Sequence, residues 1–362
     1  MFSVSTVACV FKPIGVIHMS KQPHVGVLGT GIYLPEKTMS AAEIAAKTNG
    51  NWTEENVIKK LGIKKIHMPG EDDGTQEMAV KAALDALENT GIDPLDIDVI
   101  LDIGEEWKEY PLTTSALYVQ GKIGALNAWG IDLQNRCATC LSAFKIAKDM
   151  MQNDVDTNTV MIVGGYRNGD FVDYSDPHMS MMYNLSAGAG AVILQKNLHR
   201  NLLLGSHIKA DGTLARTAGV EIGGTKNPIT KDNVSQAYKS LRLMAPQKMK
   251  DRLNAVSMDN WFECIDRALD KSDKTRKDLD YLAILHIKRS GHMGMLEALG
   301  LNENQTTYLE DYGHMGQIDQ ILSLHLGLAS GKIKDGSTIG LIAAGIGYVW
   351  GASVIEWGGK HD

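Results

Sequence analysis

The feature that most constrains this fold is a pattern that occurs twice along the chain. The apolar stretch DIDVIL at residues 96–101 has an echo, LDYLAIL, at residues 279–285. In each half a second apolar strand that ends in small residues follows, at 160–165 and at 339–345. A glycine-rich stretch comes next in both cases, AGAGAVIL in the first half and GIGYVWGASVIEW in the second. Such a repeat predicts two similar α/β halves that face one another.

The boundaries of these halves follow from the same pattern. We place the first half at residues 20–198 and the second at residues 199–362. Residues 1–19 precede the first convincing strand and are interpreted as an extension. Residues 215–255 show no clear strand and contain several Pro, Lys and Met residues, so they are predicted to be an insertion.

Cys137 lies where a short strand pattern turns into a helix pattern. Apolar and small or polar residues alternate over 129–133, and apolar residues then recur at helical spacing as far as Met150. A cysteine at a helix N-terminus meets free backbone N–H groups and the positive end of the helix dipole, which both favour the thiolate. The position therefore predicts a nucleophile.

Other interpretations of the C-A-T-C segment remain open at this point. A cysteine often behaves as a small buried hydrophobe. A C-x-x-C pair is also typical of redox and zinc sites, but no second C-x-x-C or C-x-x-H group follows at zinc spacing. We therefore predict no metal, and we expect Cys140 to pack inward.

The overall composition narrows the class of protein. The chain has 362 residues, of which 44% are hydrophobic, enough for a large core. Its formal charge of −7 argues against nucleic acid as a partner. No apolar run reaches the length of a membrane span, and four irregularly spaced cysteines do not form a disulfide framework. We expect a cytoplasmic protein that does not bind membranes.

Polar residues follow the predicted strands and could surround Cys137. His286 ends the strand that starts at Leu279, and His314 lies in a loop of the second half. Taken singly, a histidine at either place is more often structural. Together with a cysteine at a helix start, they fit nucleophilic catalysis, which needs a base or hydrogen-bond donor beside the thiol. Glu106 follows a strand of the first half, where surface acids are the alternative.

The residues also resemble a known family, the thiolase-like superfamily, and within it β-ketoacyl-acyl-carrier-protein synthase III. The likeness covers about residues 24–358. It rests on several landmarks in one order, which are the segment 132–147 around Cys137, HIKADG at 207–212 and AAGIGYVWG at 343–351.

The resemblance implies a fold and an activity. The fold is α/β, with two duplicated βαβαβαββ halves in a five-layered α-β-α-β-α arrangement. The activity is decarboxylative Claisen condensation of an acyl thioester with malonyl-CoA or a malonyl-carrier protein through an acyl-cysteine, giving a 3-oxoacyl thioester. No cofactor is implied, because CoA or phosphopantetheine thioesters are the substrates.

The resemblance also implies roles and partners. The backbone N–H groups of Cys137 and Ile346 would form the oxyanion hole, and His286 and His314 would donate hydrogen bonds to the enolate. Acyl-CoA and acyl-carrier protein would be the partners, and a homodimer would form through the strand before the cysteine. Basic residues that could meet the phosphates or the acidic carrier are Lys59, Lys60, Lys64, Lys65 and Arg289.

Three departures from the family pattern matter. An ungapped alignment puts Leu285, not His286, on the catalytic histidine position, and in a strand one residue of slip reverses the side chain. We expect a local bulge to restore His286. His314 replaces the family's asparagine, and Arg136 puts a bulky charge where the family has a small residue.

Two other functions are alternatives to decarboxylative condensation. One is a non-decarboxylating condensing enzyme similar to hydroxymethylglutaryl-CoA synthase, in which Glu106 would be the general base. The other is a non-catalytic thiolase-fold subunit of a heteromeric acyltransferase, which the Leu285 register and Arg136 favour.

Overall fold

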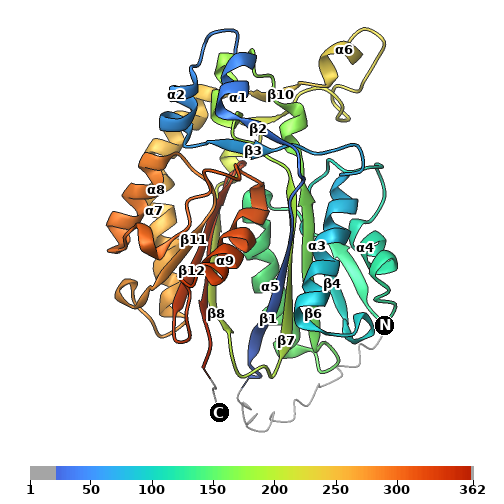
Figure 1. The fold of residues 1–362 in the computed structure, drawn as a ribbon, viewed down its shortest axis with the longest axis vertical. Coiled ribbons are helices and arrows are strands. Elements are labelled where there is room, and N and C mark those ends of the chain that lie inside the picture. Colours follow the sequence, from blue (N-terminus) through green and yellow to red (C-terminus); the bar gives the residue numbers. More distant parts are fainter. Residues whose placement is uncertain (1–21, 360–362) are drawn as a thin grey trace, which may run out of the picture.

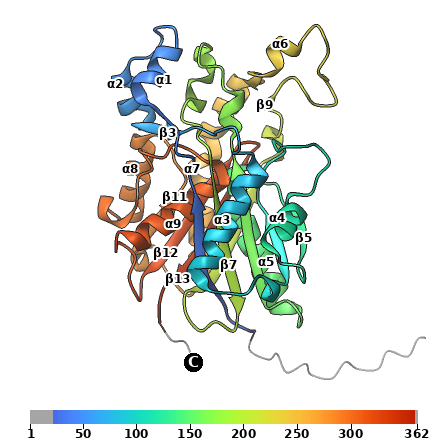
Figure 2. The same ribbon diagram turned by 45° about the vertical axis from the view of Figure 1, so that its right-hand side comes forward.

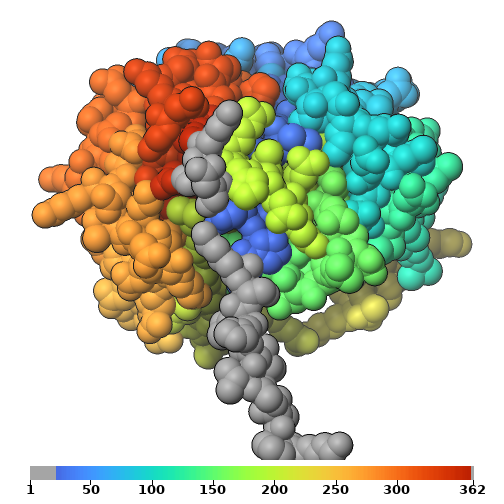
Figure 3. Space-filling model, turned by 90° about the horizontal axis from the view of Figure 1, so that it is seen from below, coloured from blue at the N-terminus to red at the C-terminus, as the bar shows by residue number. Residues whose placement is uncertain are grey.

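The computed structural model of the chain describes residues 22–359 (Figure 1). The predicted extension at residues 1–19 lies outside the described residues. Seen from below, the first half of the chain occupies one side of the molecule and the second half the other (Figure 3).

Nine strands form one continuous sheet that consists of two similar groups. In order across the sheet, the first group is β5 (Trp129–Asp132), β4 (Val99–Asp102), β6 (Thr159–Tyr166), β7 (Gly188–Lys196) and β1 (Val25–Tyr33). The second group is β8 (Leu202–Ala210), β13 (Val349–Glu356), β12 (Thr338–Gly345) and β11 (Tyr281–Ile284). Only Gly26 and Leu202 pair between β1 and β8, so the sheet is barely continuous there.

The strand pairing confirms the predicted duplication. β4 runs parallel to β6, which is antiparallel to β7, and β7 is antiparallel to β1. In the same way β11 runs parallel to β12, which is antiparallel to β13, and β13 is antiparallel to β8. The two apolar echoes in the sequence are therefore equivalent strands, β4 and β11.

Helices on both faces of the two strand groups complete five layers, as predicted. α3 (Thr75–Thr90) and α4 (Ser115–Ile123) cover the outer face of the first group (Figure 2). α7 (Pro246–Asp270) covers the outer face of the second, and α8 (Arg289–Leu299) lies on the same side (Figure 1). The central layer consists of α5 (Thr139–Asn153) and α9 (Asp319–Ala329), which contact strands of both groups.

Several short elements of the first half lie together at one end of the molecule (Figure 1). They are β2 (Thr38–Ser40), α1 (Ala41–Lys47), α2 (Glu54–Asn56), a π-helical turn (Val57–Leu61) and β3 (Lys65–His67). Ser40 caps α1, because its hydroxyl accepts a hydrogen bond from the Glu43 N–H and the Glu43 carboxylate accepts one from the Ser40 N–H.

The structure of residues 215–255 differs in two respects from the predicted insertion. It does contain strands, since β9 (Ala218–Val220) and β10 (Leu241–Leu243) pair antiparallel on either side of α6 (Val234–Ala237). Strands of three residues are too short to show an alternating pattern. The segment also ends earlier than predicted, because α7 begins at Pro246, where proline is favoured in the first turn of a helix.

Glycine determines how closely the outer layer packs on the sheet. A Cβ atom at Gly31 in β1 would lie 2.2 Å from the carbonyl oxygen of Ala82 and 2.3 Å from the nitrogen of Ala86, both in α3. These are backbone atoms of a helix, so they cannot move without separating the layers.

We therefore expect Gly31→Ala to destabilise the protein by about 1–3 kcal/mol, the usual cost of overpacking a core. Gly121→Ala is the matched control, because a Cβ atom at this exposed site in α4 would meet nothing within 4 Å. Alanine is the better helix former there, so the melting temperature should be unchanged or higher. Equal melting temperatures for both variants, measured by differential scanning fluorimetry, would contradict this account.

Candidate active site

Cys137 lies at the start of the central helix, in the turn that joins β5 to α5. Residues Arg136–Ala138 form a single 3₁₀ turn, and α5 follows directly. Arg136 has φ of +53°, in the left-handed region, so the chain turns sharply at this point. The Thr139 hydroxyl secures the turn, since it accepts a hydrogen bond from the Asn135 N–H and donates one to the Arg136 carbonyl. Only 9% of Cys137 is exposed.

The turn between β12 and β13 approaches Cys137 from the second half. A Cβ atom at Gly345 would lie 3.0 Å from the Cys137 nitrogen and 2.9 Å from the Arg136 Cβ. Only glycine allows this approach without a shift of the chain. Ile346, the predicted second donor of an oxyanion hole, is the next residue of the same turn.

His314 is the imidazole that contacts the cysteine. Its Nε2 lies 3.4 Å from the Cys137 Sγ, and its Nδ1 lies 2.5 Å from Oδ2 of Asp319. Two backbone hydrogen bonds fix the segment, from the His314 N–H to the Asn184 carbonyl and from the Ser186 N–H to the His314 carbonyl. The structure thus joins residues of the two halves at this point, across the central layer.

Asp319 also sets the charge of His314. Burial lowers the pKa of His314, but the Asp319 carboxylate and the Cys137 sulfur outweigh it, and the pKa lies well above its usual value. Asp319 itself is fully buried at the start of α9. The sequence analysis did not single it out, although an acidic residue five positions after a candidate histidine at a helix start was a usable signal.

His286 lies beside His314 and does not form a hydrogen bond with the sulfur. Its backbone N–H donates to Asp319 Oδ2 at 2.7 Å, while its ring nitrogens face the Asn184 amide and the Gly62 carbonyl, at 3.0 and 3.3 Å. Burial lowers the pKa of His286 to about 4, so the ring is neutral at pH 7. The predicted convergence of both imidazoles on Cys137 is thus found for His314 only, because the His286 ring contacts Asn184 and Gly62 and only its backbone N–H reaches Asp319.

The register at this point follows from where the chain leaves the sheet. Leu285 packs in the hydrophobic core, and its N–H still bonds to the Ile342 carbonyl of β12. The N–H of His286 turns away to Asp319. The chain therefore leaves the strand ladder after Leu285, which brings the His286 ring inward.

The carboxylate on the site side is Glu105, and the choice of Glu106 is corrected. Glu106 is ion-paired with Arg136, at 2.5 and 2.8 Å, and 58% of its side chain is exposed. The Glu105 side chain is 8% exposed, accepts a hydrogen bond from Asn168 and lies 3.6 Å from Arg136. Neighbours in an extended chain point to opposite sides, and β4 is buried on both faces, so its sequence did not reveal which acid points inward.

Burial raises the pKa of Glu105, although Arg136 and Asn168 oppose the shift. Both acids pair with the Arg136 guanidinium, whose charge also interacts with Cys137. The bulky charge before the cysteine is therefore accommodated by an ion pair.

The predicted basic residues lie on the surface near the end of the molecule that α1, α2 and β3 form. Lys59 pairs with Glu55 at 2.6 Å. Lys64 and Arg289 share one carboxylate, Glu310, at 2.7 and 3.6 Å. Arg289 also pairs with Glu303, and no ion pair is recorded for Lys60 or Lys65 within residues 22–359.

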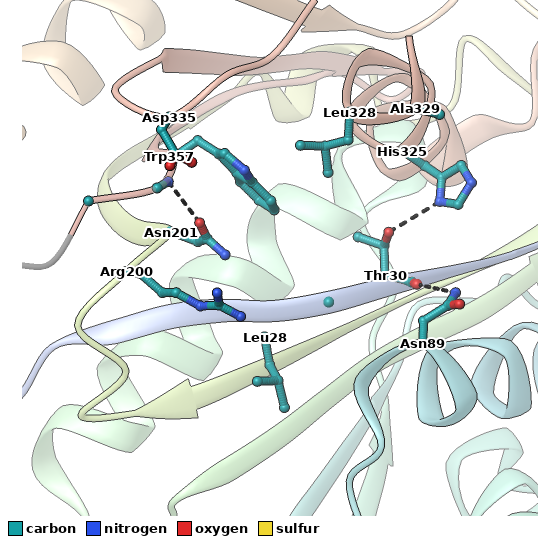
Figure 4. A pocket seen from close by; sticks show the side chains of 13 residues that line it. Leu28, Thr30, Asn89, Arg200, Asn201, His325, Leu328, Ala329, Asp335 and Trp357 are labelled. Carbon is teal, nitrogen blue, oxygen red and sulfur yellow. Dashed lines mark hydrogen bonds between the residues drawn. The ribbon is translucent and has the colours of Figure 1, made fainter. Parts of the chain in front are cut away.

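A cavity of about 820 Å³ lies apart from this site (Figure 4). Its lining includes Thr30, Arg200, His325 and Trp357, and none of the predicted site residues. Within the described part of the chain, no group of His, Cys, Asp and Glu is arranged to hold a metal ion. No helix in that part is both long and apolar enough to cross a membrane.

A cysteine at the N-terminus of a central helix, between two duplicated strand groups, is typical of the thiolase class. Comparisons with known proteins agree. The family described as 3-oxoacyl-[acyl-carrier-protein] synthase III matches residues 131–212, and its C-terminal family matches residues 269–357.

Curated relatives align over nearly the whole chain. The β-ketoacyl-[acyl-carrier-protein] synthase III of Clostridioides difficile is 26% identical over 339 residues, covering 92% of this chain and 98% of the relative. That of Acaryochloris marina is 28% identical, covering 92% and 97%. The crystal structure of the priming β-ketosynthase of the R1128 polyketide pathway shares the fold, with a TM-score of 0.80, 22% identity and coverage of 95% and 99%.

The chain is a β-ketoacyl-acyl-carrier-protein-synthase-III-like member of the thiolase superfamily.

The buried neutral state of His286 predicts how stability depends on pH. Its pKa is about 4 in the folded protein against 6.5 for an ordinary histidine, so between these values the unfolded chain binds a proton that the folded protein does not. Stability that is present above pH 6.5 is therefore lost as the pH falls. The loss due to this group at pH 5 is about 2 kcal/mol.

We expect His286→Gln, which keeps an N–H for the Gly62 carbonyl, to show a smaller drop in melting temperature between pH 7 and pH 5 than the parent protein. His178→Gln, at an exposed position, is the control and should leave the drop unchanged. A drop in the His286→Gln variant as large as that of the parent would show that His286 does not carry this pH dependence.

Proposed function

We propose that this protein condenses an acyl thioester with a malonyl thioester by decarboxylative Claisen chemistry, giving a 3-oxoacyl thioester. The observation that carries the proposal is the 3.4 Å contact between Cys137 Sγ and His314 Nε2 at the start of the central helix. The curated relatives, whose names describe β-ketoacyl-acyl-carrier-protein synthases, support the same reaction.

Acyl transfer is the first step. The thiol proton of Cys137 passes to His314, and the thiolate attacks the acyl carbonyl. Backbone N–H groups of Cys137 and Ile346 are proposed to hold the oxyanion, which fits the close approach of Gly345 to the Cys137 nitrogen. When the tetrahedral intermediate collapses, the leaving thiolate takes the proton from His314 and departs as a free thiol.

Condensation follows with the second substrate. Loss of CO₂ from the malonyl thioester leaves an enolate whose oxygen needs hydrogen-bond donors. His314, whose pKa is raised, regains a proton from solvent and donates through Nε2. His286 supplies a second N–H, which in the resting protein faces the Gly62 carbonyl. The enolate carbon attacks the acyl carbonyl, and Cys137 leaves as a thiolate.

The thioester carriers are proposed to be CoA and acyl-carrier protein. Both carry phosphate, and the carrier has an acidic face, so cationic side chains at the entrance favour their approach. Lys60 and Lys65 are the best placed of the predicted set, since Lys59, Lys64 and Arg289 already pair with acids. We propose no cofactor, and a cytoplasmic setting fits the free thiols of Cys137, Cys140 and Cys264.

A non-decarboxylating condensation is the second candidate, and Glu105 favours it. A buried carboxylate with a raised pKa close to His314 is suited to take a proton from the carbon next to a thioester carbonyl. The two reactions differ in the acceptor, because only the first needs a malonyl thioester. Product formation with acetyl thioester alone would favour the second.

We expect an acyl adduct on the protein after incubation with a panel of acyl-CoAs, observed by intact-protein mass spectrometry. The adduct should be absent in Cys137→Ala and retained in Cys140→Ala, because Cys140 is fully buried and its pKa is raised by burial. Loss of the adduct in Cys140→Ala alone would identify the other sulfur as the nucleophile. No adduct with any donor would support the non-catalytic subunit.

We further propose a homodimer formed through β5. This strand is at the edge of the sheet, and its side chains Trp129 and Ile131 are 52% and 43% exposed. Apolar side chains on an unpaired edge favour pairing with another strand. Leu117 and Leu126 extend the exposed apolar surface close to it.

Ile131→Asp should therefore convert a dimer to a monomer in size-exclusion chromatography with light scattering, because it places a charge on the edge that pairs. Leu84→Asp, at a site of similar exposure on α3, is the control and should leave the dimer intact. A parent protein that elutes as a monomer, or a dimer that survives Ile131→Asp, would contradict the proposal.

A further inference from the structure

Asp319 contacts both site histidines, through the ring of His314 and the backbone N–H of His286. Its Oδ2 lies 2.5 Å from His314 Nδ1 and accepts the His286 N–H at 2.7 Å, and its Oδ1 accepts the Met315 N–H at 2.7 Å. It is fully buried, with 0% exposure. Within residues 22–359 its recorded ion-pair partner is His314 alone. A buried carboxylate is costly unless it is paired with a charge.

The hydrogen bond to Asp319 determines which nitrogen of His314 faces the sulfur. An ionised carboxylate only accepts hydrogen bonds, so the Nδ1 of His314 must be the donor. In the neutral ring Nε2 then carries a lone pair, and it points at Cys137 Sγ from 3.4 Å. Cys137, His314 and Asp319 are therefore arranged as a nucleophile, a base and an acid that orients the base, as in hydrolases with a catalytic triad.

We infer that Asp319 is a positioning residue that holds His314 with Nδ1 protonated, so that the Cys137 proton moves to Nε2 and the site rests as a thiolate–imidazolium pair. The inference rests on the proposed role of Cys137 as the nucleophile. It does not depend on which acceptor receives the acyl group. In the condensation step the same carboxylate would keep His314 charged as a donor to the enolate oxygen.

Other titratable groups face the Cys137–His314 pair, and their effects must be distinguished from that of Asp319. They are Glu105 after β4, Arg136 before α5, Tyr166 at the end of β6, His286 after β11 and Tyr348 before β13. The pKa values of both tyrosines are raised, that of Tyr348 to about 12, that of Arg136 is raised, and that of His286 is lowered to about 4. Burial raises the pKa of Glu105, so Glu105 is the other acid that the experiment must separate from Asp319.

The test is the rate of Cys137 alkylation by iodoacetamide, which needs no thioester substrate. The full-length protein is treated between pH 5.5 and pH 10, and labelling of Cys137 is quantified by peptide mass spectrometry. In the parent protein the rate should reach half its maximum near or below pH 7, well under the value of about 8.5 for a free cysteine. A midpoint at the free-cysteine value would overturn the inference without any variant.

Asp319→Asn removes the negative charge and keeps the shape. We expect the midpoint to rise by at least about one pH unit and the rate at pH 7 to fall about tenfold, as a free thiol requires. At pH 10, where the thiol ionises without help, the rate should stay within about twofold of the parent. A uniform loss at every pH would indicate a merely structural role, and an unchanged profile would also overturn the inference.

Two further variants complete the experiment. Ser323→Ala is the matched control, since Ser323 is an equally buried polar residue of α9 that contacts Tyr281 and not His314. Its profile should equal that of the parent. Glu105→Gln tests the other acid, and a midpoint shift as large as that of Asp319→Asn would reassign the effect to Glu105. If condensation fails with every donor while the alkylation profile is as expected, only the proposed function fails.

Discussion

The structure depends on the burial of α5 and α9 between two groups of strands. Each of these helices contacts strands of both halves, so neither half can bury its inner face alone. The N-terminus of α5 presents Cys137, and the chain leading into α9 carries His314. Because the same apolar contacts hold both helices, the packing that forms the core also sets the distance between the sulfur and the imidazole.

The charged groups in that layer are tolerated because they are paired. Asp319 accepts three hydrogen bonds, from His314, His286 and Met315, in a region without water-exposed neighbours. In such surroundings electrostatic interactions are strong, and the loss of a partner is costly. Three amide side chains near the site are exceptions, because buried atoms of Gln317, Gln320 and Asn184 have no hydrogen-bond partner within residues 22–359. The amide nitrogen of Asn184 still holds the His286 ring, which ties the second imidazole to the first half.

The sequence predicted the fold more completely than the site. The duplicated strands and the helix that begins after Cys137 both follow from local patterns. The site depends on single-residue choices that such patterns do not encode. Glu105, and not Glu106, points inward, and Asp319 was missed, because both outcomes depend on the path of the chain after a strand or before a helix.

The sequence by itself determined the two repeated halves, the central helix and the position of Cys137 at its start. Periodicity, turn residues and caps act over a few neighbouring residues, so they can be read along the chain. Only the tertiary structure decided which imidazole meets the sulfur, which acid orients it and where Arg136 finds its partners. These contacts join segments far apart in the chain, and a change of one residue in register or of one side-chain rotamer is enough to exchange the groups that meet.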